Sequence, residues 1–94
     1  MAREIVTIQV MPESPDVEVA GLQDEVLRLV TDFVAEESVE TRVEVKPVAF
    51  GLELLEVKFV RPEGVGDLEK LCAGVEGIEG VRSCEVTDMR RAIG

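Results

Sequence analysis

The chain is organised around one stretch, Lys46–Val60, whose second half has the pattern of a central β-strand. Three apolar residues in it, Leu55, Val57 and Phe59, alternate with residues of mixed or charged character. Because successive side chains of a strand point to opposite faces, this alternation predicts one buried face and one mixed or charged face. The rest of the chain must supply what covers the buried face.

A predicted turn, Pro47–Gly51, precedes this strand and reverses the chain. Phe50 lies within the turn and is one of only three aromatic residues in the protein. Two placements of its ring are open. The ring either folds back under the turn into the core, or it projects outward and is available to a partner.

Apolar periodicity predicts the remaining elements. They are a strand at 4–11, a helix at 17–35, a strand at 39–46 that reads as half-buried, the central strand, a helix at 66–75 and a strand at 81–89. Ser14 or Asp16 is expected to cap the first helix. Gly74, Gly77 and Gly80 are expected to end the second helix. Glu36–Ser38 interrupts the pattern between the first helix and the second strand.

The order β-α-β-β-α-β predicts an α+β fold, the ferredoxin-like plait, in which two helices cover one face of a four-stranded antiparallel sheet. Its usual strand order, 4-1-3-2, puts the first and third strands in the centre, which agrees with the apolar character of the third. Parity in the last strand turns Cys84 and Val86 inward. Residues 90–94 then read as a tail that begins with Arg90 and Arg91.

Composition restricts the function. With 94 residues the chain has the size of one domain, and 20 acidic against 10 basic residues give a net charge of −10. We therefore expect no direct nucleic-acid binding, and a surface that suits a basic protein partner. The N-terminus shows no signal peptide and no apolar run spans a membrane, so the expected location is the cytoplasm. Histidine is absent, which excludes histidine-based catalysis and most zinc sites.

Three other functions fit the residues poorly. The open sheet face needed for RNA stacking has no aromatic residue. Glu53 and Glu56 form a candidate acid/base pair, but such pairs arise by chance in so acidic a chain. Cys72 and Cys84 lack further metal ligands and read as buried reduced thiols, with a disulfide as the less favoured alternative. The remaining hypothesis is that the chain presents a surface to a protein partner, through Phe50 and the arginines at the chain end.

Several segments together resemble the archaeal translation elongation factor 1-beta family. They are Val10–Asp16, Pro47–Leu52, Ile78–Val81 and Glu85–Arg91. The resemblance covers essentially the whole chain, with the segments in the family's order. It implies that residues 1–94 form a single guanine-nucleotide exchange domain with the ferredoxin-like plait.

The resemblance also implies a function and a site. The partner is expected to be the GTPase elongation factor 1-alpha, and the factor itself needs no cofactor, metal or catalytic residue. Phe50 and Gly51 match the family's Pro-x-x-Phe-Gly turn, whose phenylalanine contacts the GTPase. Arg91, preceded by Arg90, falls where eukaryotic relatives insert a lysine near the magnesium and phosphate site. A small ferredoxin-like regulatory or ligand-binding module is the alternative.

Topology separates these two contacts. The turn between the second and third strands lies at one end of the sheet, and the last strand leaves from the opposite end. A strand of about nine residues spans roughly 30 Å. We therefore expect a two-point clamp, with Arg91 at the nucleotide and Phe50 at a more distant domain of the GTPase.

Overall fold

The computed structural model describes residues 2–35, 39–64 and 66–92. Its elements are β1 (Arg3–Pro12), the 3-10 turn η1 (Val19–Leu22), α1 (Gln23–Val34), β2 (Thr41–Pro47), the 3-10 turn η2 (Ala49–Gly51), β3 (Glu53–Pro62), α2 (Leu68–Glu76) and β4 (Val81–Ala92). The predicted break at 36–38 and the last two residues of the predicted tail lie outside the described residues.

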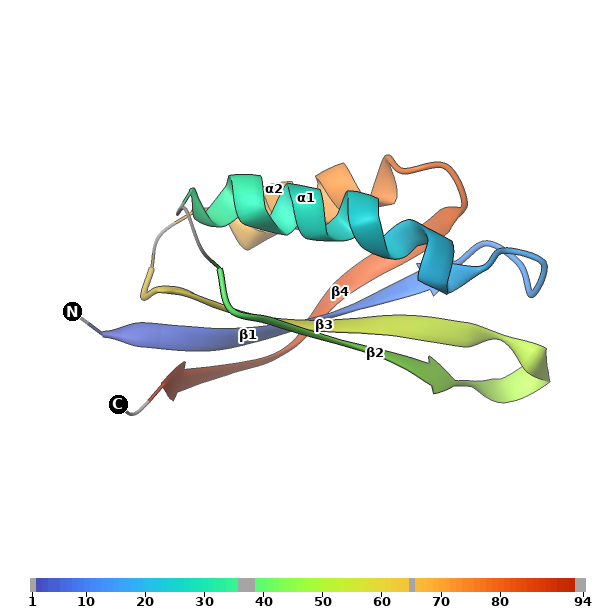
Figure 1. Ribbon diagram of the computed structural model, residues 1–94, viewed down its shortest axis with the longest axis horizontal. Helices are drawn as coiled ribbons and strands as arrows, with labels where there is room; N and C mark the ends of the chain where they lie inside the picture. Colours follow the sequence, from blue (N-terminus) through green and yellow to red (C-terminus); the bar gives the residue numbers. More distant parts are fainter. Residues whose placement is uncertain (1, 36–38, 65, 93–94) are drawn as a thin grey trace.

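The strands form one antiparallel sheet in the order β2-β3-β1-β4, which confirms the predicted ferredoxin-like plait. Both helices lie on the same face of this sheet, and the other face carries no element (Figure 1). The β2–β3 hairpin projects at one end of the molecule, whereas both chain termini lie at the other (Figure 1). The molecule is elongated, with extents of 42 × 22 × 20 Å.

The core lies between the sheet and the helices, as the alternation in β3 predicted. Leu55, Val57 and Phe59 are at most 1% exposed, and they face the buried stripe of α1. Phe59 meets Phe33 of α1 edge to face, with ring centroids 6.2 Å apart. Such aromatic contacts add to the free energy gained from burial alone. The buried strand β3 therefore anchors the β2–β3 hairpin to the core.

The first helix begins later than predicted. The chain makes the 3-10 turn η1 first, and α1 starts only at Gln23. Neither Ser14 nor Asp16 caps it, because the residue at the N-cap is Leu22, which has no side-chain cap. Ser14 instead accepts a backbone hydrogen bond from Val17 within the preceding loop, at 3.2 Å. The prediction of side-chain capping at this end was wrong.

The strand at 39–46 is less buried than its pattern indicated. It runs over Thr41–Pro47, and Val43 is only partly buried while Val45 is 41% exposed. Both lie opposite buried residues of β3, Val57 and Leu55 respectively, so they do face the helix side. However, β2 is an edge strand, and its valines are covered less completely than the central strands. Alternation indicated the correct face but overestimated the burial.

The C-terminal half also departs from the predictions. Gly74 lies inside α2, which runs to Glu76, so it does not end the helix. Gly77 follows at the C-cap and Gly80 adopts a positive φ of 93° in the next turn. The last strand continues to Ala92, so Arg90 and Arg91 belong to β4 and are not part of a free tail. Among the described residues, no helix is long and apolar enough to cross a membrane.

Candidate functional site

The tip of the β2–β3 hairpin is an exposed, uncharged surface. The six residues Pro47 to Leu52 carry no charge, in a chain where 32% of the residues are charged. Phe50 at its apex is 94% exposed, the most exposed large apolar side chain among the described residues. The ring therefore projects into solvent, and the alternative in which it folds back into the core is excluded. An exposed apolar patch of this kind is typical of a protein-contact surface.

The backbone at the tip explains how Phe50 is held outward. Phe50 has φ 63° and ψ 32°, and Gly51 follows with φ 75°. Leu52 N–H donates to the carbonyl of Ala49 at 3.3 Å, and Val48 N–H donates to the carbonyl of Leu52 at 2.7 Å. Positive φ at both central residues defines the type I′ turn, which matches the twist of the strands it joins.

Phenylalanine is an unfavourable residue at this position. The first central position of a type I′ turn favours asparagine, aspartate or glycine. A side chain with a Cβ in the left-handed region costs about 1 kcal/mol. Because Phe50 gains almost no burial in return, its presence is not explained by folding. Gly51, in contrast, adopts its positive φ without this cost.

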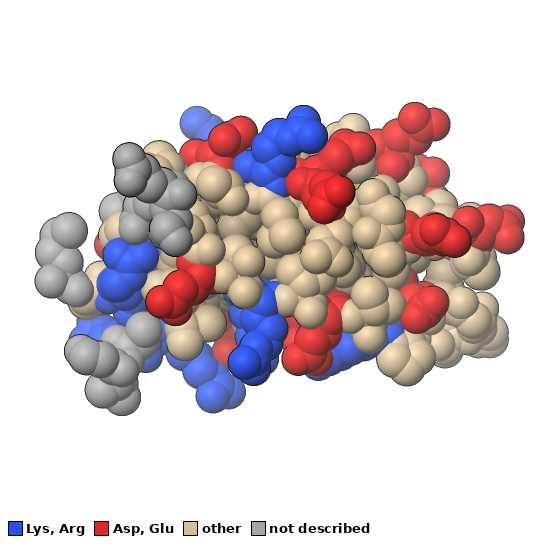
Figure 2. Space-filling view, viewed as in Figure 1, with Lys and Arg blue, Asp and Glu red and all other residues tan. Residues whose placement is uncertain are grey.

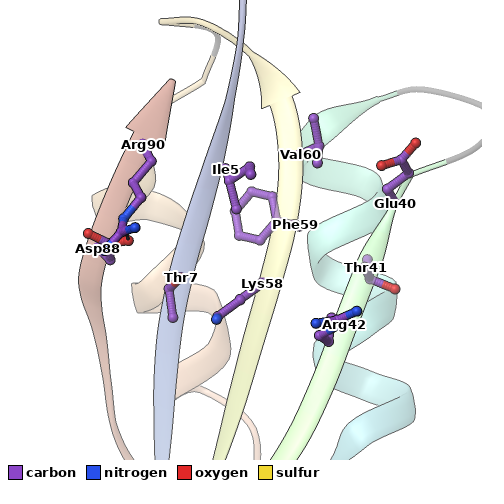
Figure 3. Close-up of a pocket in the computed structure, with 10 residues that line it drawn as sticks. All are labelled: Ile5, Thr7, Glu40, Thr41, Arg42, Lys58, Phe59, Val60, Asp88 and Arg90. Carbon is purple, nitrogen blue, oxygen red and sulfur yellow. Dashed lines mark hydrogen bonds and ion pairs between the residues drawn. The ribbon is translucent and has the colours of Figure 1, made fainter. Parts of the chain in front are cut away.

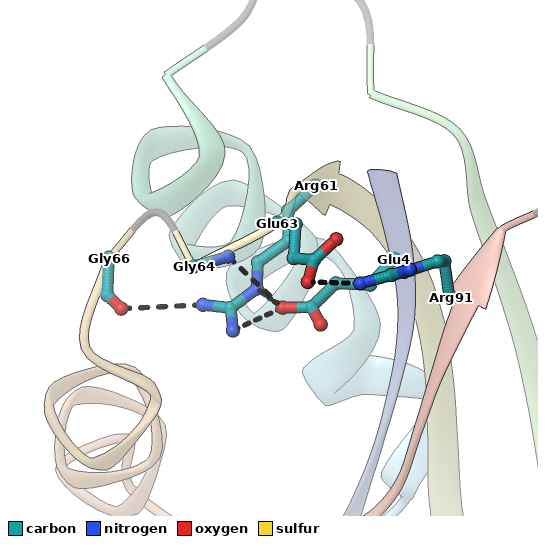
Figure 4. A network of polar contacts seen from close by, with 6 residues as sticks. All are labelled: Glu4, Arg61, Glu63, Gly64, Gly66 and Arg91. Atoms are coloured by element: carbon teal, nitrogen blue, oxygen red, sulfur yellow. Dashed lines mark hydrogen bonds and ion pairs between the residues drawn. The ribbon is translucent and has the colours of Figure 1, made fainter. Parts of the chain in front are cut away.

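The other end of the sheet carries a polar network. Nε of Arg61, at the end of β3, donates to Oε1 of Glu4 at 2.7 Å, and Nη1 donates to the carbonyl of Gly66 at 3.3 Å (Figure 4). The Arg61 and Glu4 side chains are only 7% and 15% exposed. The Arg61 guanidinium also lies 6.0 Å from the centre of the Phe33 ring. This pair ties β1, β3 and the start of α2 together.

Arg91 joins the edge of this network. Its Nη2 donates to Oε1 of Glu63 at 2.9 Å, and its side chain is 70% exposed (Figure 4). The hydrogen bond that Arg91 donates to Glu63 raises the pKa of the Arg91 guanidinium above its usual value. Since exposed ion pairs contribute little to stability, Arg91 can leave Glu63 at small cost. The sequence pattern gave no sign of Glu63, although topology places the loop after β3 at this end of the sheet.

Arg90 and Arg91 lie on opposite faces of β4. Arg90 pairs with Asp88 at 2.9 Å and lies across from Ile5 on the face without helices, whereas Arg91 lies across from Glu4 on the helix side. Neighbouring strand residues point to opposite faces, and a β-bulge decides which of the two arginines lies on which face. Thr7 pairs with Asp88 while Ile8 pairs with Val86, so one extra residue shifts the parity of everything after it.

Phe50 and Arg91 are far apart, as the topology predicted. Arg91 aligns through Glu4 with Arg61, near the end of β3, and Phe50 lies just before the start of the same strand. The ten residues of β3 span roughly 33 Å. Figure 1 shows the hairpin and the C-terminal end of β4 at opposite ends of the molecule.

The charges follow the same axis. In the view of Figure 2, Lys and Arg side chains lie mostly in the half that carries the termini, and Asp and Glu gather toward the half that carries the hairpin. The hairpin tip itself is uncharged in this view. The two ends therefore differ in chemistry. The hairpin end is apolar and lies beside acidic side chains, whereas the end with the termini is rich in cations.

The other candidate residues do not form a reactive site. Glu53 is exposed on the helix side of β3, and Glu56 lies on the other face, so the two carboxylates do not converge. Lys46 pairs with Glu56 at 3.0 Å, and the hydrogen bond from Lys46 lowers the pKa of that carboxyl although burial opposes it. Across the part of the chain that the structure describes, no three potential ligands are close enough to hold a metal ion.

The cysteines are free thiols in contact with each other. The Sγ atoms of Cys72 and Cys84 are 3.1 Å apart, and burial raises the pKa of both thiols. A raised pKa lowers the thiolate fraction and hence the reactivity. Cys84 is buried and Cys72 is partly buried, which agrees with the predicted structural role.

The comparisons with known proteins match nearly the whole chain. The EF-1 guanine nucleotide exchange domain matches residues 5–92. The elongation factor 1-beta of Methanothermobacter thermautotrophicus is 38% identical over 97% of this chain and 98% of its own length. That of Nanoarchaeum equitans is 33% identical over 90% of this chain and its full length. A de novo designed protein, Foldit4, shares the fold with a TM-score of 0.61 at 18% identity, over 98% of both chains.

Proposed function

The chain belongs to the elongation factor 1 guanine-nucleotide exchange family, and from this premise we propose that it binds elongation factor 1-alpha and promotes the replacement of GDP by GTP during protein synthesis in the cytoplasm. Residues 1–94 act as one exchange domain in this proposal. The factor supplies no acid or base to the reaction. It acts by binding the GTPase, so its effect is on the nucleotide equilibrium and on the rate of release.

The observation that carries the proposal is the strained and exposed Phe50. A turn that favours asparagine or glycine holds a phenylalanine 94% exposed on an uncharged tip. Folding does not account for that choice, whereas an aromatic anchor for a protein partner does. Gly51 supports the anchor by supplying the second positive φ of the turn.

Arg91 provides the second contact of the proposed clamp. A guanidinium brought near the magnesium and phosphate site of the GTPase repels the metal ion and competes for the phosphates. A factor that binds the nucleotide-free GTPase more tightly than the loaded form weakens nucleotide affinity by the same factor, because linkage is reciprocal. Arg90, on the opposite face of β4, contacts a different part of the partner than Arg91 does.

The test is the release of fluorescent GDP from elongation factor 1-alpha. The wild-type protein should accelerate release, and Phe50→Ala and Arg91→Ala should each reduce the acceleration at least tenfold. Arg28→Ala is the control, because Arg28 is exposed on α1, away from both ends of the sheet. If both variants match the wild type, the clamp is wrong. If the wild type binds a small ligand but not the GTPase, the regulatory module is the correct function.

A further inference from the structure

The face of the sheet without helices carries two rows of charge. Strand register aligns each row across all four strands. The first row consists of Arg42, Lys58, Thr7 and Asp88, and the second consists of Glu44, Glu56, Gln9 and Glu85. The first row is therefore basic over β2 and β3, and the second is acidic at both edges and in the centre.

The basic row contains an unfavourable pair. Arg42 and Lys58 are direct partners across β2 and β3. Like charges directly opposite each other destabilise a sheet. Among the described residues neither side chain forms a hydrogen bond or an ion pair, and the favourable effect of Lys58 is limited to its charge, which helps to lower the pKa of Glu56.

The two cations border a hollow of about 710 Å³ on this face. Arg90 lines the hollow from the other side, on β4, and Ile5 and Val60 contribute apolar side chains to its lining (Figure 3). Figure 3 shows the cations arising from three different strands, with the helices behind the sheet. Its acids are Asp88, already paired with Arg90, and Glu40. The lining thus has three cations against two acids, in a protein of net charge −10.

We propose that this hollow binds an acidic surface segment of elongation factor 1-alpha, a deepening that rests on the proposed function. Carboxylates of the partner pair with Arg42 and Lys58, which removes the like-charge repulsion that the free protein carries. The hollow also lies on the open face between the hairpin tip and the end of β4, so a partner that contacts Phe50 and wraps around the edge of the sheet to Arg91 can cover it.

The surroundings favour a protein segment over a nucleic acid. Within the described chain, this face presents no aromatic side chain on which a base could stack. Phe59 borders the hollow but is only 1% exposed and belongs to the core, and Phe50 is at the tip. The neighbouring acidic row repels a phosphate backbone that would continue beyond the hollow. A protein segment, in contrast, can place acids over the basic row and bases over the acidic one.

The experiment measures binding of nucleotide-free elongation factor 1-alpha to the full-length protein, at salt concentrations from about 50 to 300 mM. The test variant is Arg42→Gln/Lys58→Gln, and the control is Lys70→Gln, an exposed cation on α2 in the opposite layer. We expect the test variant to bind roughly tenfold more weakly at low salt and to depend less on salt. Lys70→Gln should bind as the wild type does.

Unfolding by urea separates this role from a structural one. The double substitution removes both the repulsive Arg42–Lys58 pair and the favourable charge of Lys58 near Glu56, so its unfolding midpoint should stay close to that of the wild type while its binding weakens. Unchanged affinity and salt dependence in the test variant would overturn the proposal. It would also be overturned if the test variant bound the GTPase as the wild type does but lost binding to an RNA oligonucleotide. The proposed function fails separately, if the wild type does not accelerate GDP release.

Discussion

Replacement of Phe50 by asparagine should make the protein more stable and less active at once. The residue has φ 63° in a type I′ turn, where asparagine is favoured. Relief of the left-handed strain is worth about 1 kcal/mol. Since the side chain is 94% exposed, only about 12 Å² of it is buried, and losing that area costs about 0.3 kcal/mol.

The net effect on the free energy of unfolding is a gain of about 0.7 kcal/mol. For a domain of this length, that gain raises the melting temperature by about 3–5 °C. Phe50→Ala is the matched control, because alanine removes the same ring but lacks the short polar side chain by which asparagine tolerates the left-handed region. Its stability should remain within about 0.3 kcal/mol of the wild type.

Two assays on the wild type and the two variants test this prediction. Urea unfolding followed by circular dichroism should rank Phe50→Asn above the wild type and the alanine variant. GDP release from elongation factor 1-alpha should be slow with both variants, since both lack the ring. If the asparagine variant unfolds at the same midpoint as the alanine variant, the backbone of the turn carries no strain, and the reason given for the aromatic residue there is wrong.

Four further substitutions test the rest of the structure by urea unfolding. Arg61→Met should lower the free energy of unfolding by about 3 kcal/mol, because it leaves the largely buried carboxylate of Glu4 without its partner. Arg91→Met, at an exposed pair, should leave the urea midpoint close to that of the wild type. The folded protein lowers the pKa of Glu56, so the stability that its ionised carboxylate contributes is complete above the ordinary pKa of 4.5 and is lost as pH falls through the lower folded value. Glu56→Gln should therefore reduce the loss of stability on acidification. Gly66→Ala should lower the free energy of unfolding by about 2 kcal/mol, because the added Cβ would lie 2.6 Å from the Phe33 ring at a backbone φ of 88°. A urea midpoint equal to that of the wild type would contradict this contact.

The fold was predictable because its signals are local. Alternation in β1 and β3 and the three- and four-residue steps in α1 each follow from the geometry of one element. The order of the elements then left few topologies, and the observed sheet has the predicted one. The ends of elements were less predictable. Ser14 and Asp16 have the chemistry of caps, but the loop and the 3-10 turn that follow place α1 out of their reach.

The candidate residues could be placed along the chain from the sequence, but their geometry could not, and their roles stay predictions. The turn around Phe50 could be located from Pro47 and Gly51, yet the exposure of the ring depends on backbone angles that no local pattern fixes. The association of Glu63 with Arg91 joins residues 28 apart in the chain, and it requires the register of the whole sheet. That Arg91 acts on the nucleotide site stays a prediction.

The β-bulge at Thr87 shows why parity alone misassigns the end of β4. Counting by twos from Cys84 and Val86 would put Arg90 on the helix side and Arg91 on the open face, whereas the register has them the other way round. Strand alternation separates the two adjacent cations, and the bulge decides their faces: Arg90 lines the open-face hollow, and Arg91 extends beside Glu63 at the helix side. Because β4 is an edge strand, both faces of this end are open to a partner. A partner that contacts both arginines must therefore wrap around the edge of the sheet, so neutralising Arg90 and neutralising Arg91 should impair different contacts and combine additively.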